Sequence, residues 1–171
     1  MDKRWILILI ILIVGGYCTY NIVDSSTTVG DAITVVNKSV ITIPKDFSIA
    51  DTDKNSVDLI DNKDNKKIHI EDIGKGDIAL ETFNREISLL SGSPNIHLLK
   101  NSTLNAGNMT IYKSDLENYT NDLTNVSLAY IYSSGHTFAI KFEGYSNENE
   151  LNKDLKFMVN TISPDYKQAQ D

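Results

Sequence analysis

The chain has 171 residues, of which 41% are apolar, and a formal net charge of −7. This length is typical of a single domain. The acidic balance, the single cysteine and the ordinary apolar content exclude a basic nucleic-acid-binding protein, a small disulfide-bonded protein, a collagen and a wholly disordered chain.

The N-terminal part of the chain predicts a membrane anchor. Residues 5–23 carry no charge, and as a helix they would extend about 28 Å. A hydrocarbon core of about 30 Å can just be crossed by such a helix. Lys3 and Arg4 precede the apolar segment and the next cation is Lys38, so residues 1–4 are expected in the cytoplasm. The prediction is a single-pass protein of the cell membrane, with everything after the anchor outside the cytoplasm.

Two alternatives to a retained anchor stay open. A cleaved signal peptide would need a small-residue cleavage site, and residues 15–23 contain no A-x-A-like pattern. A lipoprotein signal would use Cys18, but Gly15 and Tyr17 stand where that pattern has an aliphatic and a small residue. Because the chain departs from both patterns, the retained anchor is favoured.

A linker and several strands are expected next. Residues 24–38 are rich in Ser and Thr and predict a linker with a short extended segment at 33–36. A domain is expected over 39–163, followed by a tail at 164–171. The first strands are expected on either side of Pro44 and then at 56–61 and 67–72, where apolar and polar residues alternate as in a half-buried antiparallel hairpin.

The first helix is predicted to begin at Asp77, whose side chain would be the N-cap. Residues 92–94 read Gly-Ser-Pro and supply the end signal. Between them, apolar residues recur at spacings of three and four and form one stripe: Leu80, Phe83, Ile87 and Leu90.

The second half of the domain predicts more strands and a closing helix. Strands are expected near 96–99 and at 108–115, 125–132 and 136–144, with a tight hairpin loop at 133–135. The closing helix would begin after Ser146 or Asn147 and end before Pro164. Its apolar stripe consists of Leu151, Leu155, Met158 and Ile162.

The order of these elements predicts an α+β fold, an antiparallel β-sheet flanked by helices. The segments ITIPKDF, DLIDNKDNKKIHI, SLAYIY, HTFAIKF and MVNTI are similar to a PsbP-like domain over about residues 39–163. The resemblance implies an α/β/α sandwich and a non-catalytic accessory or binding role. The predicted anchor departs from the photosynthetic members, and nothing in the chain suggests a photosynthetic partner.

A glycine-rich segment between a strand and the first helix has the spacing of a dinucleotide-binding motif, Gly74-x-Gly76-x-x-Ala79. The preceding strand alternates where such a motif has a continuous apolar strand, and Asp77 would repel a phosphate at the helix start. The segment therefore predicts a tight turn, and no cofactor is expected.

Candidate metal and catalytic residues are few. Asp51, Asp53 and Asn55 are spaced like the first ligands of a calcium loop. Ser56 and Asn62 stand where that loop needs Gly and Glu, so a solvated turn is favoured and the three residues are weak metal candidates. His69 and Glu71 share the polar face of one strand, which is too few ligands for zinc. No G-x-S-x-G elbow is present, and no catalytic residue is predicted.

Five N-x-[ST] triplets follow the predicted anchor and are candidate N-glycosylation sites. An asparagine-rich composition explains such triplets equally well. Four of them cluster between residues 101 and 127. Their asparagines are Asn37, Asn101, Asn108, Asn118 and Asn125.

The predicted function is a membrane-anchored extracytoplasmic accessory or binding module without catalytic activity. Its partner would be an unknown membrane or envelope protein. Nucleic acid is not expected, because the part after residue 23 has 14 basic and 22 acidic residues. The alternatives are a sensor ectodomain that works through a partner protein and an envelope enzyme without a recognisable motif.

Overall fold

The computed structural model describes residues 32–118 and 124–164. Within these two ranges, neither helix has the length and apolar character needed to cross a membrane. The predicted anchor at 5–23, the cytoplasmic residues 1–4 and Cys18 lie outside the described residues, as does most of the predicted tail.

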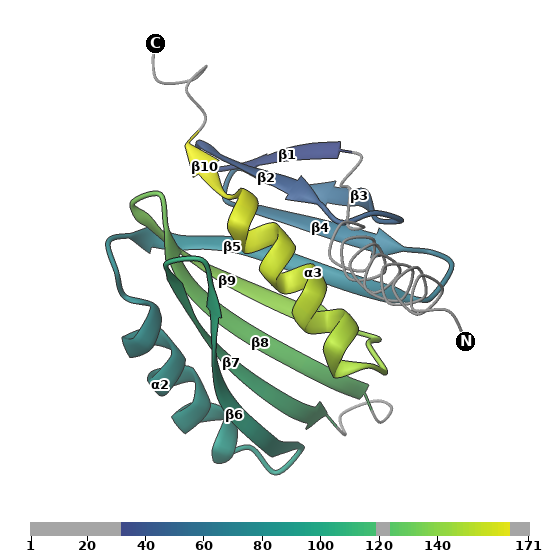
Figure 1. Ribbon diagram of the computed structural model, residues 1–171. Helices are drawn as coiled ribbons and strands as arrows, with labels where there is room; N and C mark the ends of the chain where they lie inside the picture. Colours follow the sequence, from purple (N-terminus) through teal and green to yellow (C-terminus); the bar gives the residue numbers. More distant parts are fainter. Residues whose placement is uncertain (1–31, 119–123, 165–171) are drawn as a thin grey trace, which may run out of the picture.

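A seven-stranded antiparallel sheet forms the centre of the domain (Figure 1). Two runs of successive hairpins, β3 to β5 and β6 to β9, make up this sheet, and they meet where β5 pairs with β9. The strands in spatial order are β3 (Ser48–Thr52), β4 (Ser56–Asp61), β5 (Lys66–Lys75), β9 (His136–Glu143), β8 (Thr124–Ser133), β7 (Met109–Asn118) and β6 (Ile96–Ala106).

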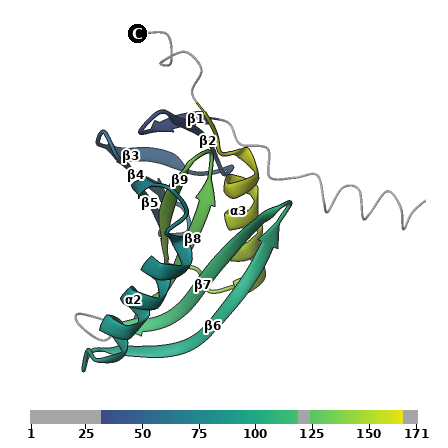
Figure 2. The same cartoon turned by 90° about the vertical axis from the view of Figure 1, so that its left-hand side faces the viewer.

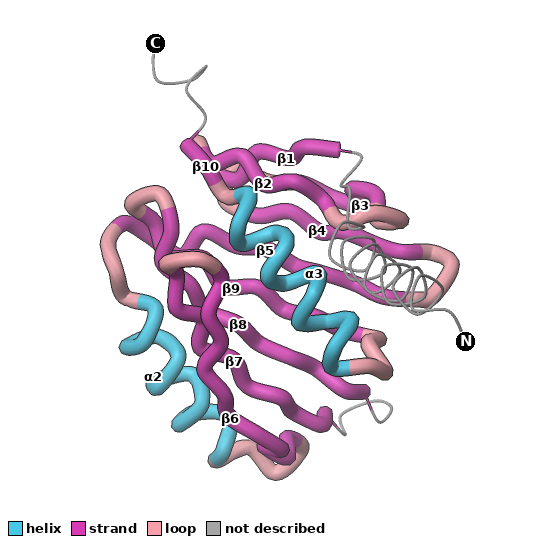
Figure 3. Tube along the Cα trace, in the orientation of Figure 1, coloured by secondary structure: helices cyan, strands magenta, loops and turns pink. Residues whose placement is uncertain are grey.

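The two helices lie on opposite faces of this sheet (Figure 2). Helix α2 (Ala79–Ser91) packs against β6, β7 and β8. Helix α3 (Glu148–Thr161) crosses the other face, beside a three-stranded sheet (Figure 3). That sheet consists of β1 (Ala32–Val36), β2 (Ser39–Ile43) and β10 (Ser163–Pro164). The predicted antiparallel sheet flanked by helices is thus confirmed.

The main core fills the space between the seven-stranded sheet, α3 and the small sheet. Ile68 and Ile70 of β5 point into it and are buried, as their alternation predicts. Leu155 and Met158 of α3 face them from the other layer and are completely buried. Each such side chain contributes about 1.5–3 kcal/mol relative to exposure, so this layer supplies most of the hydrophobic stabilisation.

A smaller core lies under α2. The ring of Phe83 is 8% exposed, and its centroid is 6.0 Å from that of Tyr112 and 6.1 Å from that of Tyr130. The predicted burial of Phe83 is confirmed. Leu80 was expected in the same stripe, but it is 48% exposed, because the short Ala79 side chain faces the sheet in its place.

The predicted N-cap of α2 is wrong. The capping position is Ile78, not Asp77, and no side chain of its own segment caps the helix. Instead, the Ile78 N–H donates to Thr137 Oγ1 at 3.1 Å, and this hydroxyl donates to the Gly76 carbonyl at 2.6 Å. Gly74 and Gly76 have φ of 142° and 89°, which favours glycine. The glycine pattern therefore shapes the turn between β5 and α2.

The start of α3 agrees with one of the two predicted caps. The Asn147 side chain accepts a hydrogen bond of 2.9 Å from the Asn149 N–H. Leu151, Leu155 and Met158 are buried on one face of the helix, as the stripe predicts.

The small sheet begins within the range that was expected to be a linker. β1 coincides with the predicted extended segment and pairs with β2 through a turn at Asn37 and Lys38, whose φ angles are 42° and 68°. Val36 is completely buried in the main core. Residues 32–38 are therefore part of the folded unit.

Candidate functional site

The face of the large sheet that carries α2 is only partly covered. Helix α2 packs on β6, β7 and β8, and no helix within the described ranges packs on β3 and β4. We call the uncovered part the open face. It is defined by outward-pointing side chains of β3, β4, β5 and β9: Asp51, Asp58, Ile60, Lys67, His69, Glu71, Lys141 and Glu143.

Ionisable side chains form a row across the strands of the open face. Asp58, His69 and Lys141 are directly opposite one another on β4, β5 and β9. The His69 Nδ1 atom lies 2.7 Å from Asp58 Oδ1. In the next row Lys67 is opposite Glu143, which forms an ion pair with Lys141. Glu143 thus has a lysine of opposite charge both across from it on β5 and beside it on β9, whereas Asp51 and Asp58 are a like-charged pair across β3 and β4.

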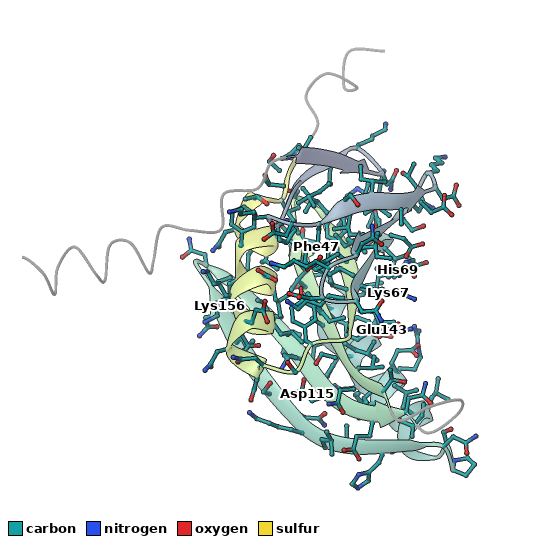
Figure 4. The ribbon with its side chains drawn as sticks, turned by 90° about the vertical axis from the view of Figure 1, so that its right-hand side faces the viewer. Phe47, Lys67, His69, Asp115, Glu143 and Lys156 are labelled. Carbon is teal, nitrogen blue, oxygen red and sulfur yellow. The ribbon has the colours of Figure 1, made fainter. Side chains whose placement is uncertain are left out.

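A hollow of about 570 Å³ lies over these two rows. Figure 4 shows Lys67, His69 and Glu143 on the side of the sheet away from α3. The His69 side chain is 39% exposed and the Asp58 side chain 52%. The polar side chains that line the hollow are carboxylates, ammonium groups and one imidazole. This arrangement suits ionic and hydrogen-bonding contact with another molecule.

The ion pairs of the open face are weak internal contacts. Exposed pairs of this kind contribute about 0–1 kcal/mol to stability, because water competes for both partners. Exchanging such a partner for a group on a docking molecule therefore costs the fold little. The surface is mixed in sign, with the carboxylates of Asp51, Asp58, Glu71 and Glu143 beside the ammonium groups of Lys67 and Lys141.

The weak metal candidates lie at the edge of the sheet. Asp51 is in β3, and Asp53 and Asn55 are in the turn that follows. The carboxylates of Asp51 and Asp53 each accept a hydrogen bond from the next backbone N–H, at 2.8 Å and 2.7 Å. In residues 32–118 and 124–164 no group of three or more His, Cys, Asp or Glu side chains could hold a metal ion.

The three histidines lie in separate places, each beside a different carboxylate. His97 Nδ1 lies 3.5 Å from Glu117, and His136 Nδ1 lies 2.7 Å from Asp72 Oδ2. His69 is on the open face together with Glu71, but Glu71 does not line the hollow.

The candidate glycosylation sites divide into two groups. Asn101, Asn108 and Asn125 are exposed on β6, the β6–β7 turn and β8. Asn118 is half-buried at the end of β7. Asn37 is also half-buried, and its Nδ2 donates a hydrogen bond of 2.6 Å to Asp72. The four later sites are therefore on the half of the sheet away from the open face.

The sequence analysis overlooked two sets of residues. Alternation places Lys67, Lys141 and Glu143 on outward faces, but the pairing of β5 with β9 that brings them together has no local signal. Lys113 stands two residues after the buried Ile111, at an inward position of β7, and its side chain is completely buried. A lysine at an inward-facing position of a strand was a signal in the sequence from which this buried charge could have been predicted.

Two solved structures have a fold similar to that of this domain. The Ran-binding protein Mog1p of Saccharomyces cerevisiae has a TM-score of 0.51 and 12% identity, over 80% of this chain and 97% of the yeast chain. A protein of Bacteroides thetaiotaomicron also has a TM-score of 0.51, with 11% identity, over 74% of this chain and 45% of its own.

A cyanobacterial PsbP from Synechocystis has a TM-score of 0.48 and 12% identity, over 75% of this chain and 87% of the cyanobacterial one. No family model matches the sequence, and no curated protein matches it either. The chain therefore shares the fold of Mog1p.

Proposed function

We propose that this protein is a non-catalytic binding module that docks a protein partner through its open face. The observation that carries the proposal is the hollow of about 570 Å³ over side chains of both charge signs, on the part of the sheet face that α2 leaves uncovered. The yeast protein of the same fold is described as a Ran-binding protein. That description is a precedent for protein binding by this fold, although the identity of 12% carries over no partner.

The proposal includes an anchor and a location. Residues 5–23 would hold the module in the cell membrane, with the domain outside and its role that of a PsbP-like accessory protein. The uncharged segment and the cations Lys3 and Arg4 support this orientation. Protease added to intact cells should then remove the domain. A mature N-terminus downstream of residue 16 would contradict the retained anchor.

The mixed charges of the open face indicate the kind of partner. A nucleic acid or an anionic lipid surface would be repelled by the acidic domain. A protein surface that carries both acidic and basic side chains can pair with both signs of the open face. Such association should weaken with added salt, because the screening length falls from about 10 Å at 0.1 M to about 3 Å at 1 M.

Site-specific photocrosslinking in native cells tests the docking surface. A photoreactive residue would replace Lys67 or Lys141 on the open face, and Lys156 on the outer side of α3 as the matched control (Figure 4). We expect one protein adduct from the two open-face positions and none from position 156. An adduct only from position 156, or none from any position, would refute the proposed surface.

Charge reversal then measures the contribution of the surface. Lys141→Glu places a second carboxylate beside Glu143 and should weaken binding of the crosslinked partner at least about tenfold, equivalent to about 1.4 kcal/mol. Lys156→Glu makes the same charge change on α3 and should leave the affinity within about twofold. Equal losses from both variants would show that net charge, not the open face, governs binding.

A further inference from the structure

Lys113 carries its charge into the interior of the domain. The side chain is completely buried on the α3-facing side of β7, next to the core residue Ile111. A buried ammonium group is strongly unfavourable unless it is paired. Its Nζ lies 2.8 Å from the Asp115 carboxylate and 3.5 Å from Glu148 Oε1. Lys113 therefore has one close anionic partner and one distant one.

Three other structural elements bring polar groups to the surroundings of this lysine. Ser127 Oγ of β8 donates to the Asp115 carboxylate. Lys100 Nζ of β6 lies 3.0 Å from the Glu148 carboxylate at the start of α3. The hydrogen bond from Lys100 and the charge of Lys113 together lower the pKa of Glu148. Glu148 is thus an anion shared between two lysines.

A cavity of about 260 Å³ adjoins this group, which we call the lysine pocket. The charged residues of its wall are Lys100, Lys113, Asp115 and Glu148. Most of the wall's exposed area is apolar, with Leu99 and Leu151 among its residues, and the uncharged polar residues are Asn125, Ser127, Ser146 and Asn147. A water molecule occupies about 30 Å³ in the liquid, so the space admits a small organic molecule. An apolar wall with a few polar groups at one end is the usual design of a ligand site.

Glu148 is the replaceable member of the lysine pocket. Its side chain is 50% exposed, whereas that of Asp115 is 19% exposed and bound by Ser127. Glu148 also occupies the first turn of α3, where the helix dipole favours a negative charge. If its side chain rotates into solvent, another carboxylate can bind between the two lysines at the start of the helix. The ammonium groups of Lys100 and Lys113 then still have an anionic partner.

We propose that the lysine pocket binds a short-chain carboxylic acid. The ligand carboxylate would lie between Lys100 and Lys113 in place of Glu148, and its alkyl chain would contact Leu99 and Leu151. This site shares no residue with the open face, so it does not rest on the proposed docking function. An amine held between Asp115 and Glu148 is the opposite arrangement, and the test below distinguishes the two.

Calorimetric titration of the purified full-length chain in a neutral detergent tests the proposal. The probes are butanoate, pentanoate and hexanoate, with 1-pentanol and pentylamine as chain-matched controls. We expect saturable binding of the acids, with affinity rising about three- to fourfold per added methylene. The alcohol and the amine should bind at least about tenfold more weakly than pentanoate. Absence of saturable binding by all three acids would overturn the proposal.

Two substitutions at the half-exposed rim give opposite expected effects. Glu148→Gln removes the competing carboxylate and should tighten pentanoate binding at least about threefold. Lys100→Gln removes one cation and should weaken it about tenfold, while Lys156→Gln, outside the pocket, should change nothing. Circular dichroism would verify that each variant is folded. Saturable pentylamine binding that Glu148→Gln abolishes would show an amine site and refute the carboxylate site.

Discussion

The side-chain amide of Asn37 donates a hydrogen bond of 2.6 Å to the carboxylate of Asp72, 35 residues further along the chain. The Asp72 side chain is 1% exposed, accepts a second hydrogen bond from the Gly74 N–H at 2.9 Å and lies 2.7 Å from His136 Nδ1. A buried carboxylate is unfavourable without hydrogen-bond partners. The contact therefore fixes the β1–β2 turn to β5 and β9 in the large sheet.

The first prediction concerns this hydrogen bond. Asn37→Gly removes the amide but keeps the left-handed backbone, because Asn37 has φ of 42° and glycine adopts such angles freely. The free energy of unfolding should fall by about 1.5–3 kcal/mol, the range for hydrogen bonds to charged groups. Urea unfolding measures it. Lys38→Gly, at the neighbouring left-handed position, is the control, and an equal loss there would attribute the effect to the turn backbone.

Truncation tests where the folded unit begins. A chain that starts at residue 30 retains β1 and should fold without the N-terminal segment. A chain that starts at residue 39 lacks the completely buried Val36 and the Asn37 amide, so its urea midpoint should be clearly lower. Equal midpoints would show that residues 32–38 add nothing to stability and act as a linker after all.

Local signals account for the elements that the sequence predicted correctly. Alternation at Ile68 and Ile70 predicted the buried face of β5, and the spacing of Leu151, Leu155 and Met158 predicted the buried face of α3. The spacing of apolar residues predicts the buried face directly, since each element contributes its apolar side chains to one face.

The errors arise where an element depends on contacts between residues that are far apart in the chain. The side chain that accepts from the Ile78 N–H at the start of α2 is Thr137, about sixty residues away, so no local pattern could point to it. β6 continues to Ala106 through residues 100–105, which are polar except for Leu104, because it is an edge strand with few buried positions. The rows of the open face depend on the pairing of β5 with β9, which no spacing within either strand encodes.

The third prediction compares Thr137, which binds the Ile78 N–H at the start of α2, with Asp77, the cap expected from the sequence. Thr137→Val keeps the shape of the side chain but leaves the Ile78 N–H and the Gly76 carbonyl without their partner. It should lower the free energy of unfolding by about 1–3 kcal/mol and speed amide hydrogen exchange in the first turn of α2. Asp77→Ala should change stability by less than about 0.5 kcal/mol. The reverse ranking would restore Asp77 as the cap.

The fourth prediction concerns the small core under α2. Phe83→Ala removes a ring that packs against Tyr112 and Tyr130, so unfolding should become easier by about 3 kcal/mol, the lower end for a buried ring. Leu80→Ala, on the same helix but 48% exposed, should cost less than about 1 kcal/mol. Similar costs for both variants would mean that the helix is rotated relative to the sheet.

The last prediction follows from Asp154, whose Oδ2 accepts a hydrogen bond of 2.9 Å from the Tyr145 hydroxyl. Burial raises the pKa of Asp154 above its ordinary value of 3.8, the charge of Glu150 adds to this, and the hydrogen bond from Tyr145 opposes it. Above pH 3.8 the folded chain therefore holds this proton more tightly than the unfolded chain does. The contribution of Asp154 to the free energy of unfolding must then decrease as the pH rises through that window.

Asp154→Asn keeps an oxygen that accepts from Tyr145 and removes the titrating group. In urea unfolding between pH 3.5 and 7, the free energy of unfolding of the variant should therefore no longer show the decrease that Asp154 causes. The variant should be more stable than the natural chain near pH 7. Glu148→Gln provides a control of opposite sign. The pKa of Glu148 is lowered by the hydrogen bond from Lys100 and the charge of Lys113, so its stabilising contribution is present near neutrality and is lost as the pH falls. That variant should lose stability near pH 7 and converge with the natural chain in acid. An Asp154→Asn variant that is equally destabilised at every pH would show that the carboxylate stabilises the fold in its charged form.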